Sequence, residues 1–183
     1  MTFWSSPNAD PKRKYRFLVR LFNQEIAWYV KSVTAPSYEI TSIEHAFSDH
    51  VFNFPGKIKW SDVEVTLVDP AGDNDVVHKT LSLIQTAGYE IPKFSDLENA
   101  FKTFTKASLV GNNGNLSIET QDAEGNTVEK WTLNNAFITN VKFGDFDYNS
   151  EDMREISLTF KYDWASCEFQ NGEKAGSDFF TNG

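Results

Sequence analysis

The sequence contains little of what a disulfide-stabilised, metal-binding or membrane-spanning protein requires. Its 183 residues include one cysteine and three histidines. A single cysteine, Cys167, cannot form an internal disulfide, so the fold must be stable without one. The longest apolar runs, such as residues 26–30, are far shorter than the roughly 20 residues that a helix needs to span a bilayer. We therefore expect no membrane segment.

The first residues also lack the features of a secretory signal. Residues 1–7 do not contain a basic region followed by an apolar stretch, which a signal peptide requires. We expect a soluble protein that acts inside the cell that makes it.

Positive charge is scarce as well. The chain has 17 lysines and arginines against 26 aspartates and glutamates, which gives a formal net charge of −9. Such a surface repels nucleic acid at long range, so the composition gives no support to a DNA-binding function. In contrast, 40% hydrophobic and 15% aromatic residues are enough for a packed core and exclude global disorder. The length fits one domain.

Apolar and polar residues alternate along most of the chain, as in half-buried β-strands. Residues 38–59 are extended but follow no clean period. Seven or so strands with one or two flanking helices indicate a mainly β fold, an antiparallel β-sandwich or barrel. The predicted strands and hairpins cover residues 15–34, 63–67, 116–133, 136–143 and 154–164.

Only the middle of the chain changes to a helical period. Asp73 can cap a helix whose apolar residues recur at spacings of four and three and that ends near Gly88. A second helix is predicted to open at Ser95, with Glu98 in capping-box register, and residues 111–114 are predicted to form a turn. The apolar face predicted for the first helix consists of Val77, Leu81 and Ile84.

The two ends of the chain differ from its body in composition. Residues 1–14 mix prolines and polar residues with a basic run at 12–14, which is typical of a surface arm. Residues 165–183 are mostly polar and contain glycine, which is typical of a tail. We therefore predict an N-terminal arm over residues 1–14, a β-barrel domain over residues 15–164 and a polar C-terminal tail over residues 165–183.

No combination of residues points to catalysis or to a cofactor. His45 and His50 are five residues apart in an extended region. Their side chains would fall on opposite faces of a regular strand, so we do not expect a metal site there. Residues 145–152 are rich in acids but lack the order of an EF-hand, which favours an acidic loop between strands. We expect a protein that is not an enzyme.

Two stretches of the chain resemble the tail tube proteins of contractile-tailed bacteriophages. Residues 54–67 read FPGKIKWSDVEVTL, in which a glycine and a basic residue precede an aromatic-flanked strand. The other stretch comprises residues 131–141, WTLNNAFITNV, followed by residues 155–164, EISLTFKYDW. Together the similarity covers most of residues 15–164.

The resemblance implies a β-barrel or sandwich whose copies form hexameric rings with a continuous inner β-barrel. The rings would stack helically into a hollow tube that supports the contractile sheath and conducts DNA into the host without binding it specifically. The implied partners are further copies of the chain, the tail sheath protein, and the baseplate and tail terminator proteins. The implied location is the tail tube of a virion, assembled in the host cytoplasm.

Other interpretations stay open. A baseplate tube initiator, or the inner tube of a phage-like injection system, would have the same fold. A carbohydrate-binding β-sandwich belongs to a different class and would use exposed tryptophans and tyrosines to stack on sugars. That function predicts a monomer with a shallow aromatic groove.

One set of candidate site residues lies in the extended segment 38–59 and just beyond it. Its scattered apolar side chains would promote aggregation if they stayed exposed on a monomer, so we expect a neighbouring ring or subunit to cover them. Gly56 would provide a bend, and Trp60 would serve either as an anchor or as a core residue. The candidates for this contact are Phe47, Val51, Phe52, Phe54, Gly56, Lys57 and Trp60.

A second set consists of acids that could face the lumen of the tube. A basic wall would bind passing DNA through counterion release and stall it, whereas an acidic wall would repel it. The alternative is that these acids only keep the outer surface soluble. The candidates are Glu119, Glu129, Asp145 and Asp147.

Overall fold

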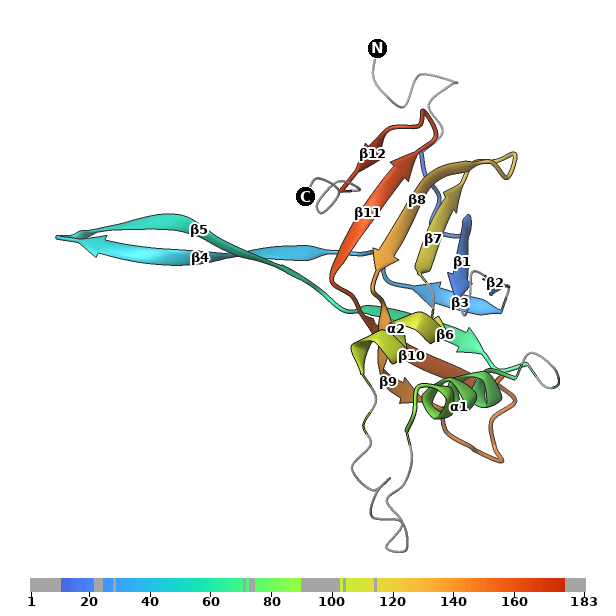
Figure 1. Ribbon diagram of the computed structural model, residues 1–183. Helices are drawn as coiled ribbons and strands as arrows, with labels where there is room; N and C mark the ends of the chain where they lie inside the picture. Colours follow the sequence, from blue (N-terminus) through green and yellow to red (C-terminus); the bar gives the residue numbers. More distant parts are fainter. Residues whose placement is uncertain are drawn as a thin grey trace, which may run out of the picture.

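Period-two alternation builds two antiparallel sheets that share one core, and a long hairpin projects from them (Figure 1). The mainly antiparallel β fold predicted from the sequence is thus confirmed. The computed structural model describes residues 11–21, 25–27, 29–70, 72, 75–89, 103, 105–113 and 115–176.

The larger sheet has six strands in the order β12-β11-β8-β7-β1-β2. These strands are β1 (Phe17–Leu21), β2 (Glu25–Ile26), β7 (Leu116–Gln121), β8 (Thr127–Asn134), β11 (Trp164–Phe169) and β12 (Lys174–Ala175). The smaller sheet has four strands in the order β3-β6-β10-β9. These are β3 (Val30–Val33), β6 (Val63–Val68), β9 (Phe137–Lys142) and β10 (Glu155–Lys161). The hairpin forms a separate sheet of β4 (Tyr38–Phe47) and β5 (His50–Trp60).

Alternate residues of the central strands fill the space between the two sheets. In β6, the odd-numbered residues are buried while Glu64 stays exposed, which confirms the strand predicted there. In β10, Ile156, Leu158 and Phe160 are buried in the same way. The largest side chains that are fully buried include Leu67, Leu133, Ile156 and Leu158.

At two corners, the chain passes directly from a strand of one sheet to a strand of the other. The chain leaves β8 and enters β9 through Asn135 and Ala136, and Asn135 is a non-glycine residue with a φ of 56°. It leaves β10 and enters β11 through Tyr162 and Asp163. At this corner Asn135 Nδ2 donates to Asp163 Oδ2 at 2.7 Å, and Lys106 Nζ lies 2.7 Å from Asp163 Oδ1. Corners of this kind let two sheets cross at a steep angle around a shared core.

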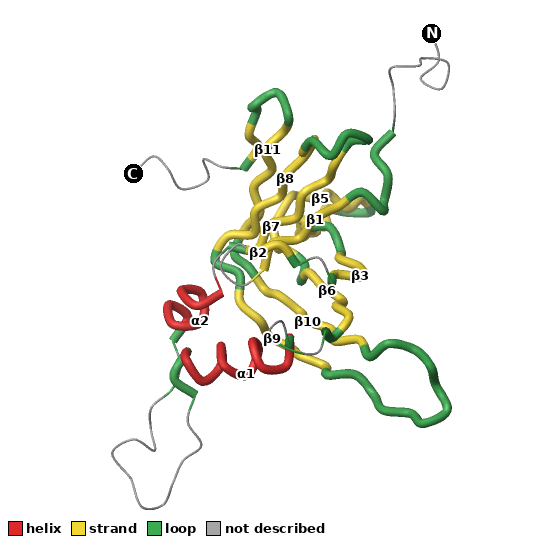
Figure 2. Tube along the Cα trace, turned by 90° about the vertical axis from the view of Figure 1, so that its right-hand side faces the viewer, coloured by secondary structure: helices red, strands yellow, loops and turns green. Residues whose placement is uncertain are grey.

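Both helices lie beside β9 and β10 (Figure 2). Helix α1 spans Val76–Thr86, and its N-cap is Asp75, whose side chain accepts a hydrogen bond from His78 N at 2.9 Å. The predicted cap, Asp73, lies outside the described residues. The predicted apolar face is wrong in part, because Leu81 is 53% exposed. The face that α1 buries consists of Val76, Thr80 and Leu83.

Helix α2 spans Lys106–Asn113. The turn predicted at residues 111–114 is therefore wrong for its first three positions, because the helix continues through Gly111. The second helix predicted from Ser95 falls largely on residues 90–102, which lie outside the described ranges.

Two predicted boundaries also differ from the structure. The hairpin expected over residues 15–34 extends for only two paired positions of β1 and β2, after which the chain crosses to β3 in the smaller sheet. It crosses because Ala27 and Tyr29 pack into the shared core. The tail expected from residue 165 begins later, because β11 continues to Phe169 and buries two small side chains, Ala165 and Cys167.

A substitution in the shared core should test this packing. Leu158→Ala removes a fully buried side chain, so we expect the free energy of unfolding to fall by about 2–5 kcal/mol in urea denaturation. Leu81→Ala, at an exposed position of α1, is the matched control and should change it by less than about 0.5 kcal/mol. Equal effects of the two substitutions would contradict the assignment of the core.

Candidate assembly surfaces

The β4–β5 hairpin is exposed along almost its whole length. Every residue of β4 is exposed, and in β5 only Gly56 and Trp60 are partly covered. Figure 1 shows the hairpin extending far from the two sheets. The segment that the sequence predicts to be extended, residues 38–59, is therefore a projecting hairpin.

Strand alternation gives the outer half of the hairpin two different faces. The register pairs Ile43 with Phe54, His45 with Phe52, and Phe47 with His50. Paired residues share a face, so we call these six residues the aromatic face. Its large apolar side chains are exposed by 62% (Ile43), 72% (Phe47), 47% (Phe52) and 54% (Phe54). The opposite face carries Ser42, Glu44, Ala46, Val51, Asn53 and Pro55.

This register separates the candidate contact residues. Phe47, Phe52 and Phe54 lie together, whereas Val51 pairs with Ala46 on the opposite face.

His45 and His50 share the aromatic face, so the expectation that they point to opposite sides is wrong. That expectation assumed one continuous strand, whereas a two-residue turn at Ser48 and Asp49 reverses the chain between them.

The inner half of the hairpin places its apolar residues on the other side of β4. Tyr38 pairs with Trp60 and Ile40 with Ile58, whereas Ile43 is three residues beyond Ile40. The register of β5 shifts by one extra residue at Gly56 and Lys57, opposite Thr41. Thr41 Oγ1 accepts a hydrogen bond from Lys57 N at 2.9 Å. A Cβ at Gly56 would lie 2.8 Å from Thr41 O, so this position requires glycine.

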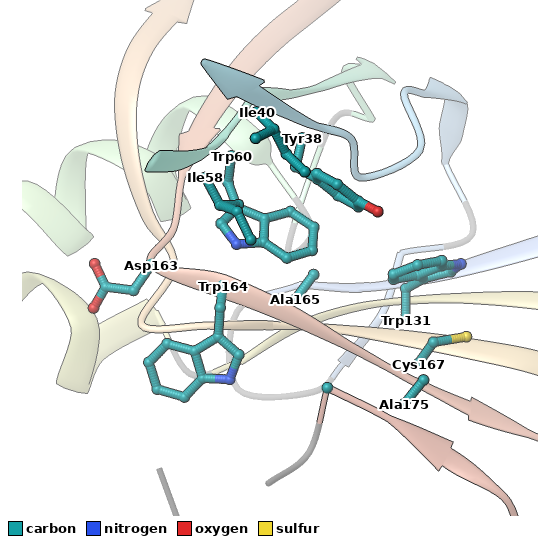
Figure 3. A pocket seen from close by; sticks show the side chains of 11 residues that line it. Tyr38, Ile40, Ile58, Trp60, Trp131, Asp163, Trp164, Ala165, Cys167 and Ala175 are labelled. Carbon is teal, nitrogen blue, oxygen red and sulfur yellow. The ribbon is translucent and has the colours of Figure 1, made fainter. Parts of the chain in front are cut away.

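An apolar groove of about 500 Å³ lies at the root of the hairpin (Figure 3). Trp60 lies between the groove and the core, since it packs against Tyr38 at 5.2 Å and against Tyr162 at 5.8 Å between ring centroids. The sequence did not predict that β8 and β11 line this groove, because these strands are far from the hairpin in sequence. The main lining residues are Tyr38, Ile40, Ile58, Trp60, Trp131 and Trp164.

Glu119 lies at the centre of the larger sheet, on the face turned away from the core. Arg20 Nε donates to Glu119 Oε1 at 2.8 Å, and Lys130 Nζ lies 3.7 Å from the same oxygen. Burial raises the pKa of this carboxyl. Arg20, Lys130 and the Thr127 hydroxyl together lower the pKa by more than burial raises it, so the pKa lies below the usual range. The charge of Glu119 is thus largely compensated by its neighbours.

The other candidate acids lie on different surfaces. Glu129 belongs to the core side of β8, where it pairs with Lys12 and accepts a hydrogen bond from Trp131 Nε1. Asp145 and Asp147 belong to the exposed loop between β9 and β10. A single wall therefore cannot contain all four acids. Alternation along β8 and β7 could have separated Glu129 from Glu119, because paired positions in the register share a face.

The described residues offer little chemistry of other kinds. Within them there is no group of three or more His, Cys, Asp or Glu side chains that could hold a metal ion. Burial raises the pKa of the Cys167 thiol, which makes it a weak nucleophile. No helix in the described ranges has the length and apolar character that a membrane crossing requires.

The ion pairs of Glu119 predict an acid-sensitive contribution to stability. A carboxyl with a lowered folded-state pKa stabilises the fold above its unfolded pKa of about 4.3, and this stabilisation is lost as the pH falls through the folded pKa. We expect Glu119→Gln to reduce the free energy of unfolding by about 1–3 kcal/mol at pH 7, with the difference disappearing in acid. Urea unfolding at several pH values measures this.

Glu168→Gln is the matched control, because Glu168 faces the same side of the sheet but is well exposed, 3.5 Å from Lys174. It should change stability by less than about 0.5 kcal/mol. A pH-independent effect of Glu119→Gln would mean that its ion pairs do not stabilise the fold.

Comparison with known proteins identifies the fold. No protein-family model and no curated protein matches the sequence. Among solved structures, the chain is similar to the sheath/tube terminator of the extracellular contractile injection system PVC, with a TM-score of 0.64 and 18% identity over 87% of this chain and 97% of that chain. It is also similar to the tube terminating cap of the anti-feeding prophage, with a TM-score of 0.62 and 17% identity over 90% of this chain and 99% of that one.

A third similar structure is a chain of the PVC sheath–tube complex in the extended state. Its TM-score is 0.60, with 18% identity over 87% of this chain and 92% of that chain. Two of these three structures come from an extracellular contractile injection system and one from an anti-feeding prophage, in agreement with the resemblance noted in the sequence. The chain has the fold of the tube terminators of PVC and the anti-feeding prophage and of a chain in the PVC sheath–tube complex.

Proposed function

We propose that the protein is a structural subunit of the tube of a contractile particle, either a phage tail or a phage-like injection system. Six copies would form a ring, and rings would stack into a hollow tube. The observation that carries this proposal is a projecting hairpin with an exposed aromatic face, on a fold otherwise found in tube components. Large exposed apolar patches on soluble proteins mark surfaces that a partner covers.

The hairpin is suited to reach a second copy. From Ile40 to Phe47 it advances about 23 Å, at roughly 3.3 Å per residue, away from the body of its own subunit (Figure 1). Contact between the hairpin and a different surface of the next copy is heterologous, and a heterologous contact that does not close produces a filament. In this arrangement the aromatic face makes the contact, Gly56 and Lys57 form the bulge, and Trp60 anchors the root.

The larger sheet would form the inner wall, with its strand edges joined to those of neighbouring copies. Its outward face carries Arg20, Lys130 and Lys174, and each lies within 3.7 Å of Glu119 or Glu168. Cations that are already paired release few counterions on meeting DNA and hold it weakly. Glu119 would then serve the lumen by offsetting part of the charge of Arg20 and Lys130, which would weaken the hold of this face on DNA.

The remaining lumen candidates would act differently in this arrangement. Glu129 would hold the N-terminal arm against the larger sheet through its ion pair with Lys12. Asp145 and Asp147 would belong to a contact surface outside the channel.

The further partners would be the tail sheath, baseplate and terminator proteins, in a virion tail assembled in the host cytoplasm. The division into an arm over residues 1–14, a tube domain and a short C-terminal tail belongs to the same proposal.

A terminating cap is the second candidate function, because two of the similar structures are tube terminators. A cap would form a ring that closes the end of a tube and does not stack on further copies of itself. A baseplate tube initiator would likewise occur in few copies. A carbohydrate-binding module would instead remain monomeric and use the tryptophan-lined groove for sugars.

Electron microscopy of the purified protein separates these functions. We expect negative staining at high protein concentration to reveal six-fold rings and hollow tubes. Single rings that never stack would favour a cap or an initiator. A strict monomer at every salt and protein concentration would overturn the proposal, and sugar binding in the groove would then be tested by tryptophan fluorescence.

The aromatic face should be necessary for tube formation. We expect the triple variant Phe47→Ser, Phe52→Ser, Phe54→Ser to fold normally, because these residues are exposed, but to lose at least tenfold in the pelleted, assembled fraction. The control Glu44→Ser, Asn53→Ser alters the opposite face of the same segment and should assemble like the parent protein. Equal assembly by both variants would exclude the aromatic face as the contact.

Deletion of the outer hairpin provides an independent check. Removing residues 42–56 leaves the core untouched, because these residues lie outside the core cluster. We expect the thermal unfolding of the deletion variant to resemble that of the parent, while stacked tubes are absent from micrographs. Tubes at the normal yield would show that the hairpin is dispensable.

A further inference from the structure

We propose that His45 and His50 make the contact of the aromatic face sensitive to pH, so that copies associate near neutral pH and separate in mild acid. This inference rests on the proposed function, since it assumes that the aromatic face is covered when copies associate. It adds a control over that contact, and its failure can be told apart from failure of the contact itself.

The two histidines lie among the apolar side chains of the aromatic face. The register places His45 opposite Phe52 and His50 opposite Phe47. Residues two apart on a strand share a face, so these four side chains form one block with the histidines at opposite corners. The rings of His50 and Phe52 meet edge to face, with 4.7 Å between their centroids and 80° between their planes.

A partner that covers the phenylalanines of this block must also cover its histidines. Phe47 is 72% exposed and Phe52 is 47% exposed in the single copy, and both histidines are exposed as well. A neutral imidazole ring leaves water at modest cost, whereas an imidazolium ion loses the hydration of a full charge. Association of copies therefore favours the neutral form of both histidines.

The aromatic face offers no counter-charge to an imidazolium ion, because none of its six residues is acidic. In the outer half of the hairpin, Glu44 lies on the opposite face and Asp49 in the turn. The inner half carries Lys57 at the bulge and an ion pair in which Lys59 Nζ lies 3.7 Å from Glu39 Oε1. Among the described strands, β4 and β5 pair with each other alone.

Burial without a counter-charge fixes the sign of the pH dependence. Histidine side chains ordinarily titrate near pH 6.5, in a range where carboxylates stay largely ionised. Burial disfavours the charged imidazolium, so association is strongest above this pH and weakens as the pH falls through it. With two histidines in each copy, the association constant should fall by up to about 100-fold per pH unit below about pH 6.5.

The net charge of the chain acts in the opposite direction. It is −9 with neutral histidines and becomes less negative as histidines gain protons. Copies then repel one another less, so net charge alone predicts stronger association in mild acid. Weaker association in mild acid requires a local cause, which the histidines of the aromatic face provide.

Sedimentation at constant ionic strength between pH 8 and pH 5.5 tests the inference. We expect the assembled fraction of the parent protein to fall by about tenfold or more and to recover when pH 8 is restored. Circular dichroism verifies that the subunit stays folded at both pH values. The double variant His45→Gln, His50→Gln cannot gain these protons, so its assembled fraction at pH 5.5 should stay within about twofold of its own value at pH 8.

His78→Gln is the matched control, because it removes a titratable imidazole from an exposed position of α1. This variant should respond to pH like the parent protein. If it loses the response as well, histidine charge in general rather than the aromatic face is responsible, and the inference is wrong. A double variant that separates in acid as the parent does would also overturn it.

Proton uptake gives a second measurement that does not depend on whether the double variant assembles. Dissociation of the parent protein by dilution in weakly buffered solution at pH 6.5 should take up protons, on the order of one per copy. A pH-indicator dye measures this uptake, and His78→Gln should show the same value. Dissociation without proton uptake would contradict the inference.

The behaviour of the parent protein separates this inference from the proposed function. If tubes form equally well at pH 8 and pH 5.5, or better in acid, the proposed function stands and the inference is wrong. If the parent protein does not assemble at pH 8, the proposed function fails, and the inference fails with it.

Discussion

The fold depends on two short corners at which the chain passes from one sheet to the other. Asn135 and Asp163 hold these corners together, and Lys106 joins α2 to the same point. Because β8 continues into β9 and β10 into β11, the two sheets must share one core. Tyr162 lies at a corner and packs against Trp60, so the direction of the hairpin is fixed by the same turn of the chain.

Two surfaces outside the core differ in character: one consists of ion pairs, and the other consists of exposed apolar side chains. On the outward face of the larger sheet, acids compensate cations at short distance. The aromatic face of the hairpin, in contrast, leaves four large apolar side chains exposed. In the proposed tube, the paired face would line the channel and the aromatic face would contact the neighbouring copy.

Sequence patterns predict the parts of this structure that depend on local alternation. The strands around Val65, Leu116 and Leu158 follow directly from period-two burial. Properties that depend on how distant segments meet could not be predicted. The shared face of His45 and His50 requires the position of the turn, and the groove beside Trp60 requires Trp131, about 70 residues away. The opposite faces of Glu119 and Glu129 were, in contrast, predictable from alternation within β7 and β8, but the lumen candidates were chosen by charge alone.

The spacing of apolar residues in β4 makes the two strands of the hairpin respond differently to a change in length. Loss of Gly56 from β5 would remove the extra residue and leave a regular ladder, with the cross-strand partners of Ile40 and Ile43 unchanged. Loss of Thr41 from β4 would instead bring Ile40 and Ile43 onto one side. The hairpin would then have one continuous apolar side instead of apolar patches on opposite sides of its inner and outer halves.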